Sequence, residues 1–188
     1  MRIGVLDLQG AVEEHIHMIE KCGYQGIRVK TLEDLNKVEK LIIPGGESTT
    51  IGKLAKIYGL DEAIIKKGKE GLPIFGTCAG MILLAREIKD YEQVKFNLIN
   101  ITVERNAFGR QVDSFEVEVK IKGMKGKSFR AVFIRAPYIK RVGKEVEVLA
   151  EFENKIIMAK QGKILVCAFH PELTDDLRVH QYFLEEKF

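Results

Sequence analysis

The sequence has 188 residues, of which 46% are hydrophobic and 30% charged, with a net charge of +3. This is the composition of an ordinary globular protein, and the length suits a single domain over residues 1–188. Lys and Arg are interleaved with Asp and Glu along the chain, which excludes a basic stripe of the kind that binds nucleic acids. No apolar run approaches the roughly 20 residues that cross a bilayer, and Asp7 interrupts the apolar start of the chain, so we expect neither a membrane span nor a signal peptide.

The first half of the sequence alternates short apolar strands with amphipathic helices. We expect strands over residues 3–8, 27–29, 40–43 and 72–75. Helices are predicted over residues 11–22, from the N-cap candidate Ser48 onwards, and over residues 79–86. Buried strands separated by helices are typical of a mostly parallel sheet covered on both faces, which indicates the α/β class.

The second half changes to the period of antiparallel strands. Apolar and charged residues alternate over residues 115–122, which predicts a half-exposed strand. Three further strands are expected over residues 146–152, 155–160 and 163–169, separated by turns at residues 153–154 and 161–162. A closing helix is predicted over residues 175–186. The sequence therefore predicts one α/β domain with an antiparallel extension.

The most informative segment, residues 72–80, has the form of a strand, then Gly-x-Cys-x-Gly, then a helix. This is the thiol version of a nucleophile elbow, in which the reactive residue, here Cys78, lies on a tight turn between strand and helix. A side chain at Gly76 or Gly80 would crowd that turn. The adjacent helix N-terminus favours a thiolate, the nucleophilic form of cysteine. A buried structural cysteine is the alternative interpretation.

A thiolate nucleophile needs a group that protonates the leaving amine, and histidine suits that role near neutral pH. His170 is the candidate, because it ends a buried strand at the sheet edge where open α/β sheets bind ligands, the edge also expected for Cys78. Glu172, two residues further on, is able to orient the imidazole, as the acid does in a Ser-His-Asp triad.

The remaining histidines and cysteines are expected to be structural or solvated. His15 and His17 lie among glutamates of the first helix and are expected on its solvated face, and His180 belongs to a polar stretch of the last helix. Cys167 lies inside an apolar strand and Cys22 ends a helix, so both are expected to be structural. Three cysteines without C-x-x-C spacing predict neither a disulfide framework nor a zinc site, and we expect a reduced, cytoplasmic setting.

A glycine-rich turn at residues 44–50, Pro-Gly-Gly-Glu-Ser-Thr-Thr, joins a strand to a helix. Its chemistry suits phosphate binding, although it lacks the Gly-Lys-Ser/Thr of a P-loop. Its other use is in an oxyanion hole, where a glycine N–H of the turn pairs with the N–H of the residue after the nucleophile.

The elbow, the Pro-Gly-Gly turn and His-x-Glu, in this order, resemble a class I glutamine amidotransferase. The chain is more closely similar to the glutaminase subunits of pyridoxal 5′-phosphate synthase, which serve vitamin B6 biosynthesis. The segments that carry this resemblance are residues 4–15, 44–50, 76–80, 105–115, 133–137 and 169–172. Leu-Gln-Gly at 8–10, Arg-Asn-Ala-Phe-Gly-Arg-Gln at 105–111 and Ile-Arg-Ala-Pro at 134–137 are the parts most specific to this subunit.

The resemblance implies a flavodoxin-like amidotransferase fold and a role for each matched residue. Cys78 would be the nucleophile, His170 the acid and base, and Glu172 the orienting acid. Gly46 and Ala79 would supply the oxyanion N–H groups. Glutamine would be contacted by Gly46, Glu47, Ser48, Arg105, Ile134 and Arg135, and the two arginines are cations suited to its α-carboxylate.

The implied reaction is hydrolysis of glutamine to glutamate and ammonia through a Cys78 thioester, with no metal or organic cofactor. The ammonia would pass to a separate (β/α)₈-barrel synthase subunit within a hetero-oligomeric lyase complex, since a chain this short has no room for an acceptor domain. Three alternatives remain: a glutaminase subunit of another pathway, such as histidine biosynthesis; an intracellular cysteine peptidase; and a catalytically silent binding module.

The isolated chain is expected to be a poor glutaminase that its synthase activates. Glycines in the turn at residues 44–46 tolerate both signs of φ, so one peptide unit there is able to flip its N–H towards or away from the site. Residues 8–14 are the predicted docking segment for the synthase, because they match the subunit family but carry no triad chemistry.

Overall fold

A computed structural model describes residues 1–105 and 114–185 of the chain. Ten strands of the described part form one sheet, in the order β2-β1-β3-β4-β12-β11-β9-β6-β5, with β10 paired to β11. Strands β7 and β8 form a small second sheet. The strands are β1 (Arg2–Leu6), β2 (Gln25–Val29), β3 (Lys40–Ile43), β4 (Ile74–Thr77), β5 (Ala85–Ile88), β6 (Ile99–Glu104), β7 (Ser114–Val119), β8 (Phe129–Ile134), β9 (Tyr138–Val142), β10 (Glu147–Phe152), β11 (Lys155–Gln161) and β12 (Ile164–Cys167).

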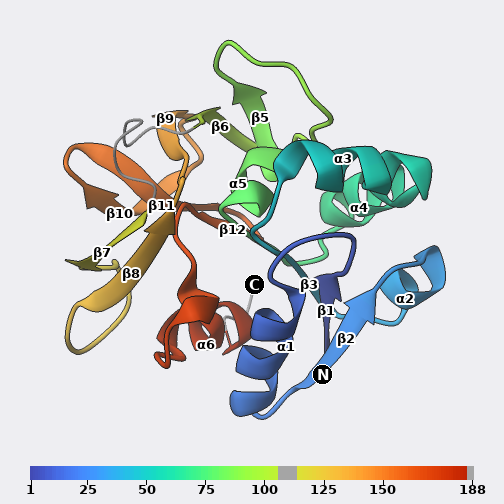
Figure 1. The fold of residues 1–188 in the computed structure, drawn as a ribbon, viewed down its shortest axis with the longest axis horizontal. Helices are drawn as coiled ribbons and strands as arrows, with labels where there is room; N and C mark the ends of the chain where they lie inside the picture. Colours follow the sequence, from blue (N-terminus) through green and yellow to red (C-terminus); the bar gives the residue numbers. More distant parts are fainter. Residues whose placement is uncertain (106–113, 186–188) are drawn as a thin grey trace.

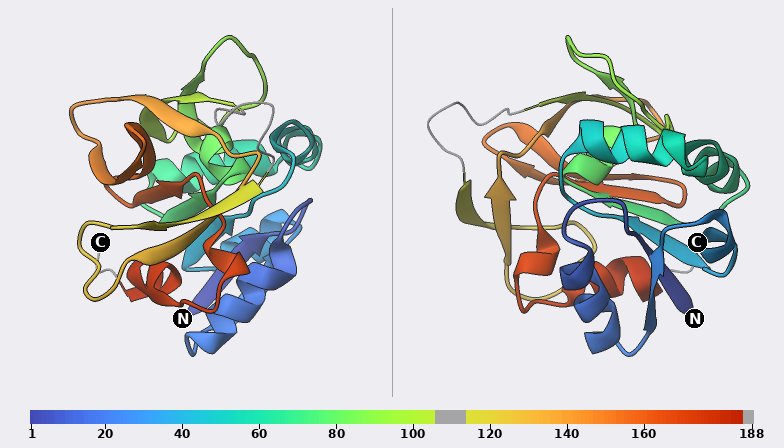
Figure 2. Two further views of the ribbon diagram at one scale, coloured as in Figure 1. Left: turned by 60° about the vertical axis from the view of Figure 1, so that its left-hand side comes forward. Right: turned by 45° about the vertical axis from the view of Figure 1, so that its right-hand side comes forward.

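Helices cover both faces of the parallel part of the sheet (Figure 1). Helices α1 (Val12–Lys21) and α6 (Arg178–Glu185) lie next to each other on one face, and α3 (Ser48–Ile57), α4 (Leu60–Lys69) and α5 (Ala79–Leu84) lie on the other (Figure 2, right). The short helix α2 (Leu32–Asn36) packs near β2, and a single 3₁₀ turn, η1 (Pro171–Leu173), follows β12. None of the helices in the described ranges is long and apolar enough to cross a membrane.

The parallel register brings three strand ends to one edge of the sheet. Strands β3 and β12 flank β4 and run parallel to it, with Ile43 opposite Gly76 and Cys167 opposite Thr77. The backbone N–H of Cys78 continues this pairing and donates to the Cys167 carbonyl at 2.8 Å. The residues that follow these strands, which include the glycine-rich turn, Cys78 and His170, therefore meet at the carboxyl edge, where ligands of open α/β sheets bind.

The predicted fold class is confirmed, and the antiparallel extension has the predicted turns. Strand β7 pairs antiparallel with β8 and alternates exposed and half-buried residues, as its sequence indicates. Glu153 and Asn154 have positive φ of 48° and 59°, and Gly162 has a φ of 53°, so both predicted turns use the left-handed region. Antiparallel β10, β11 and β12 follow from these two hairpin turns.

Several predicted boundaries were wrong. The helix after Cys78 ends at Leu84 instead of residue 86, because β5 begins at Ala85. Ser48 is not the N-cap of α3: Glu47 is, and its carboxylate accepts from the backbone N–H groups of Thr49 and Thr50. The closing helix begins at Arg178, three residues later than predicted.

Helices α2 and α4 were missed by the sequence analysis. For α2 a local signal existed, since Thr31 and Asp34 form a capping box in which each side chain accepts from the other residue's backbone N–H. Helix α4 starts after Gly59, whose φ of 67° ends the preceding helix.

Candidate active site

Cys78 lies at the N-cap of α5 with φ 49° and ψ −102°, a conformation that non-glycine residues rarely adopt. The surrounding turn is close-packed. A Cβ added at Gly76 would lie 2.6 Å from the carbonyl carbon of Gly80, and one added at Gly80 would overlap the carbonyl of Ile43. Only glycine fits at both positions, which agrees with the crowding expected of a nucleophile elbow. Backbone strain of this kind persists where the surrounding structure holds it, as it does at functional sites.

His170 and Glu172 lie beside Cys78 in the folded chain. The backbone N–H of His170 donates to the carbonyl of Val132 in β8 at 2.8 Å, which fixes the chain as it leaves β12. Nδ1 of the imidazole lies 2.7 Å from Oε1 of Glu172, and the Cys78 side chain lies near enough to the ring to influence its charge. All three residues are at most 7% exposed. The structure thus brings together the predicted nucleophile, base and orienting acid.

The electrostatics of the site favour a protonated His170. Burial by itself lowers the pKa of His170, but the interactions with Cys78 and Glu172 outweigh burial and raise the pKa from 6.5 to about 10. Burial raises the pKa of Glu172, whereas the neighbouring His15 and His170 lower it, with the net result below its ordinary value. At neutral pH the pair is therefore an imidazolium hydrogen-bonded to a carboxylate.

The Pro-Gly-Gly turn packs directly against these residues. A Cβ added at Gly45 would overlap the ring of His170 and lie 3.5 Å from Cβ of Cys78, so this position admits only glycine. The Gly45 carbonyl accepts from the Ala11 N–H at 3.0 Å. Because C=O and N–H point in opposite directions in a trans peptide, the N–H of Gly46 points away from Ala11. Gly45 and Gly46 both have φ outside the left-handed region.

The second predicted oxyanion donor is Ala79. It is the first residue of α5, so its N–H has no acceptor within the helix. It directly follows the nucleophile candidate, as the oxyanion interpretation requires.

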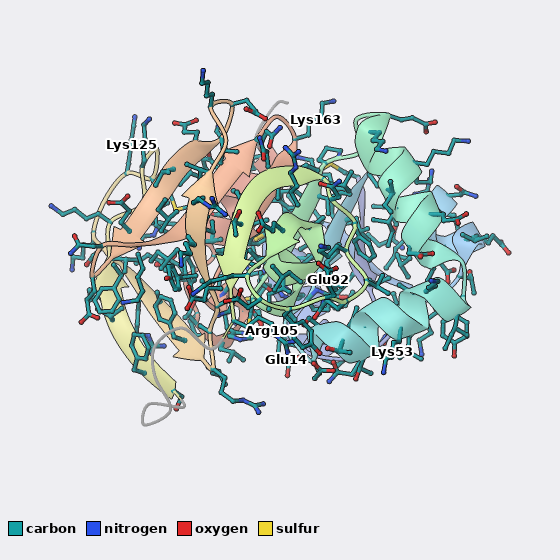
Figure 3. The ribbon with its side chains drawn as sticks, turned by 90° about the horizontal axis from the view of Figure 1, so that it is seen from above. Glu14, Lys53, Glu92, Arg105, Lys125 and Lys163 are labelled. Atoms are coloured by element: carbon teal, nitrogen blue, oxygen red, sulfur yellow. The ribbon has the colours of Figure 1, made fainter. Side chains whose placement is uncertain are left out.

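The predicted glutamine contacts Glu47 and Arg105 lie together at the rim of the site. A guanidinium nitrogen of Arg105 is 3.7 Å from Oε1 of Glu47, and the guanidinium stacks 4.3 Å over the ring of Tyr91. Figure 3 shows Arg105 near the start of α3. Burial raises the pKa of Glu47, but hydrogen bonds from Thr50 and Thr49 outweigh it, and the carboxylate stays ionised. A cation and an anion side by side suit the two charged groups of an α-amino acid.

The other residues predicted to contact glutamine differ from one another in burial and in the elements that carry them. Ser48 is buried, and its hydroxyl donates to the side-chain carbonyl of Gln93 at 3.1 Å. Ile134 ends β8, the strand that hydrogen-bonds to His170, and Arg135 follows it with an exposed side chain and a φ of 42°. Most of the segment 105–115, which carries part of the resemblance, lies outside the described residues.

The expectation for His15 and His180 was wrong. Both are fully buried, although His17 is exposed as expected. Nδ1 of His15 lies 2.9 Å from Nε2 of His180, and Nε2 of His15 lies 3.5 Å from Oε2 of Glu172. The signal that was missed is helical spacing: His15 lies on the buried stripe of α1 between Val12 and Ile19.

The two other cysteines agree with expectation. Cys167 is completely buried in β12, and burial raises the pKa of its thiol well above the ordinary value. Cys22 follows α1 and packs against the core, with a pKa that burial raises. Neither lies on a turn between a strand and the helix that follows it, as Cys78 does. Within the described ranges, no group of three or more His, Cys, Asp or Glu side chains is arranged to hold a metal ion.

Comparisons with known proteins agree on one family for this chain. Residues 5–188 match the SNO glutamine amidotransferase family, and the chain belongs to that family. A protein of Pelotomaculum thermopropionicum named pyridoxal 5′-phosphate synthase subunit PdxT is 57% identical over 99% of this chain and 95% of its own length. The PdxT of Thermotoga maritima is 52% identical over 98% of both chains.

Solved structures agree with this assignment. A crystal structure described as a glutamine amidotransferase superposes with a TM-score of 0.93 at 50% identity, covering 97% of both chains. The structure of PurLQS from Thermotoga maritima, at 17% identity and a TM-score of 0.71, covers 98% of this chain and 97% of its own and shares the fold. The predicted resemblance and the predicted amidotransferase fold are confirmed.

Proposed function

We propose that this chain is the glutaminase subunit of a pyridoxal 5′-phosphate synthase and that Cys78, His170 and Glu172 hydrolyse glutamine. The observation that carries the proposal is the position of His170 beside both Cys78 and Glu172 in a buried site. Membership of a glutamine amidotransferase family supports the substrate, and the name that the relatives carry supports the pathway.

The reaction follows from the protonation state of the site. The Cys78 thiolate adds to the side-chain amide carbon of glutamine, and N–H groups of Gly46 and Ala79 hold the developing oxyanion. The imidazolium of His170 gives its proton to the departing amine, the C–N bond breaks, and ammonia leaves a thioester on Cys78. A water then adds to the thioester while neutral His170 takes its proton, and glutamate leaves as the sulfur regains its electron pair. Glu172 holds Nδ1 of His170 throughout, so that Nε2 faces the reacting atoms.

Glutamine itself is held at the rim. Arg105 and Arg135 bind its α-carboxylate, Glu47 binds its α-ammonium group, and Ser48, Ile134 and Gly46 complete the contacts. The proximity of Glu47 to Arg105 supports this arrangement, because each charge of the amino acid then finds a partner of opposite sign.

The ammonia passes to a (β/α)₈-barrel synthase subunit that combines it with a pentose phosphate and a triose phosphate, within a hetero-oligomer. The synthase docks on residues 8–14 and switches the oxyanion turn. Contacts within the chain support this route, because the Ala11 N–H binds the Gly45 carbonyl and the Gln9 side chain accepts from the Glu47 N–H at 2.7 Å. A partner that moves residues 9–11 therefore acts on the peptide unit that carries the Gly46 N–H.

We treat residues 1–188 as one glutaminase domain, because one cluster of buried side chains extends from β1 to α6. The reaction needs a reduced sulfur at Cys78, and all three cysteines are free, which is consistent with a cytoplasmic protein.

The experiment that tests the proposal reconstitutes the chain with the synthase subunit and measures glutamate and pyridoxal 5′-phosphate separately. We expect glutamate release by the lone chain to rise about a hundredfold when the synthase is added, which corresponds to a few kcal/mol of preference for the competent state. Gln9→Ala should reduce this activation without removing the reactive thiol. Full activity of the lone chain would contradict the switch.

Replacing glutamine by ammonium salts as the nitrogen source tests the proposed pathway. Glutamine-dependent pyridoxal 5′-phosphate formation should stop in Cys78→Ala, and ammonium salts should restore it. A chain that cleaves peptides, or that gives ammonia to an imidazole-forming synthase instead, would replace this proposal by one of the alternatives.

A further inference from the structure

A second group of buried polar side chains lies behind Glu172, on the side away from His170. His15 comes from α1, His180 from α6, and Thr77 is the last residue of β4, directly before Cys78. Nε2 of His15 lies 3.2 Å from Oγ1 of Thr77 and 3.5 Å from Oε2 of Glu172. Nδ1 of His15 lies 2.9 Å from Nε2 of His180. Side chains from three elements, α1, β4 and α6, therefore meet at His15, which lies beside the Glu172 carboxylate.

Hydrophobic packing alone does not account for this group. Burying an imidazole costs free energy unless it is hydrogen-bonded, and an apolar side chain at either position would fill the same space without that cost. Helices α1 and α6 lie next to each other (Figure 2), and their contact is made here by two histidines instead of two aliphatic residues. His15 thus lies beside Glu172, and His180 lies behind His15 in hydrogen-bond contact with it.

Both histidines are neutral at physiological pH. Burial lowers the pKa of His15 more than the nearby Glu172 raises it. Burial and the neighbouring His15 lower the pKa of His180 to about 3. A neutral pair leaves the single positive charge on His170, where the chemistry uses it.

The proton positions follow from the network. In one arrangement His15 donates from Nδ1 to Nε2 of His180. The Nε2 lone pair of His15 would then face Oε2 of Glu172, and His180 would carry its hydrogen on Nδ1, a buried donor without an acceptor among the described residues. If His180 donates from Nε2 instead, His15 carries its hydrogen on Nε2 and directs it at Thr77 and Glu172. The second arrangement has the lower electrostatic energy, because an N–H and not a lone pair faces the carboxylate.

We propose that His15 and His180 are positioning residues for glutamine hydrolysis: the Nε2–H of His180 sets the tautomer of His15, and the Nε2–H of His15 holds Oε2 of Glu172, so that Oε1 stays on His170. This inference rests on the proposed glutaminase function. It explains how Oε2, which accepts no hydrogen bond within ordinary distance from the described residues, remains ionised in a buried site. The rotation of the carboxylate, and through it the imidazole of His170, is then fixed by α1 and α6.

Two substitutions of His15 separate the donor position from packing. The amide nitrogen of a glutamine reaches the place of Nε2, whereas that of an asparagine reaches only the place of Nδ1. In the complex with the synthase, His15→Asn should lower kcat about 10- to 100-fold, the effect of losing a polar contact with a charged group, with KM for glutamine unchanged. His15→Gln should retain activity near that of the unmodified chain. His180→Phe should reproduce the direction of His15→Asn, because the tautomer of His15 is no longer set.

The pH profile distinguishes positioning from a structural role. The titratable groups that act on Glu172 are His15 from α1, His170 before η1, Cys167 from β12 and His180 from α6, and Cys78 before α5 acts on His170. Loss of the His15 N–H makes protonation of Glu172 easier, so the acid limb of kcat should move to higher pH in His15→Asn and stay in place in His15→Gln. His17→Asn, a change to the exposed histidine of the same helix, is the control and should alter neither quantity.

Two outcomes would overturn the inference. In the first, His15→Asn and His15→Gln both keep full kcat. In the second, the two variants lose kcat to the same extent, the acid limb of their pH profiles does not move, and thermal unfolding shows an equal loss of stability in both. Labelling of Cys78 by a glutamine-analogue alkylator in the unmodified chain keeps the two proposals apart: if Cys78 is labelled and turnover depends on it, failure at His15 removes only the positioning role.

Discussion

The floor and the rim of the candidate site differ in how much of their geometry the protein supplies by itself. On the floor, Cys78, His170 and Glu172 are at most 7% exposed, and Nδ1 of His170 lies 2.7 Å from Oε1 of Glu172. On the rim, the side chains of Glu47 and Arg105 are 50% and 26% exposed and meet at 3.7 Å, longer than a hydrogen bond. Buried charges are held in place before the substrate arrives, because low dielectric strengthens every interaction between them. Water screens the exposed charges of the rim, so we expect them to take their final positions only when glutamine binds.

This contrast predicts that changes on the floor act on turnover and changes on the rim act on binding. The largest effect is expected for Cys78→Ala, which removes the only cysteine on an elbow. Glutamate release should fall by about 10⁴-fold or more, with the fold intact by circular dichroism. A diazo-oxo-norleucine label should map to Cys78 alone. Label on the buried Cys167 would contradict the assignment of the nucleophile.

The second-largest effect is expected for Glu172, the acid on the floor of the site. Glu172→Gln should lower turnover by about 10⁴-fold, the typical cost of losing a triad acid, while alkylation of Cys78 stays detectable. His170→Asn should nearly stop turnover, since it removes the group proposed to protonate the departing amine. Steady-state rates and Cys78 labelling, measured for both variants, test these two roles. Unmodified turnover in Glu172→Gln would exclude that residue from the mechanism.

A smaller and different effect is expected at the rim. Arg105→Met should raise KM for glutamine about 10- to 100-fold, the range for losing a charge-assisted hydrogen bond, and should change kcat little. Lys53, an exposed cation on the neighbouring helix α3, offers the matched control Lys53→Met, for which both constants should be unchanged. If Arg105→Met lowered kcat with KM intact, the division between floor and rim would fail.

The smallest effect is a shift in the titration of His170. Its folded pKa, about 10, exceeds the ordinary value of 6.5, so its contacts stabilise the fold fully below about pH 6.5, and this stability is lost as pH rises through about 10. Cys78→Ala removes one of the two neighbouring side chains that raise this pKa. Nuclear magnetic resonance should therefore show the imidazole losing its proton at lower pH in the variant. Identical titrations would mean that Cys78 does not contact His170 in solution.

The sequence by itself determined the elements of the site whose signals are local. Cys78 was found because Gly76 and Gly80 leave room for one tight turn, and His170 and Glu172 because they follow a buried strand within three residues. The parallel strands were found from short apolar runs, and their common carboxyl edge follows from the geometry of a parallel sheet. None of these inferences needed a long-range contact.

Only the tertiary structure decided the surroundings of Glu172. His15 and His180 are 165 residues apart, and their contact exists because α1 and α6 pack side by side on one face of the sheet. Charged neighbours in the sequence made His15 resemble a solvated residue, yet its side chain points from the apolar stripe of the helix. Periodicity indicates that such a face is buried, but the partner across the interface depends on which helices the sheet brings together, and a local pattern holds no information on that.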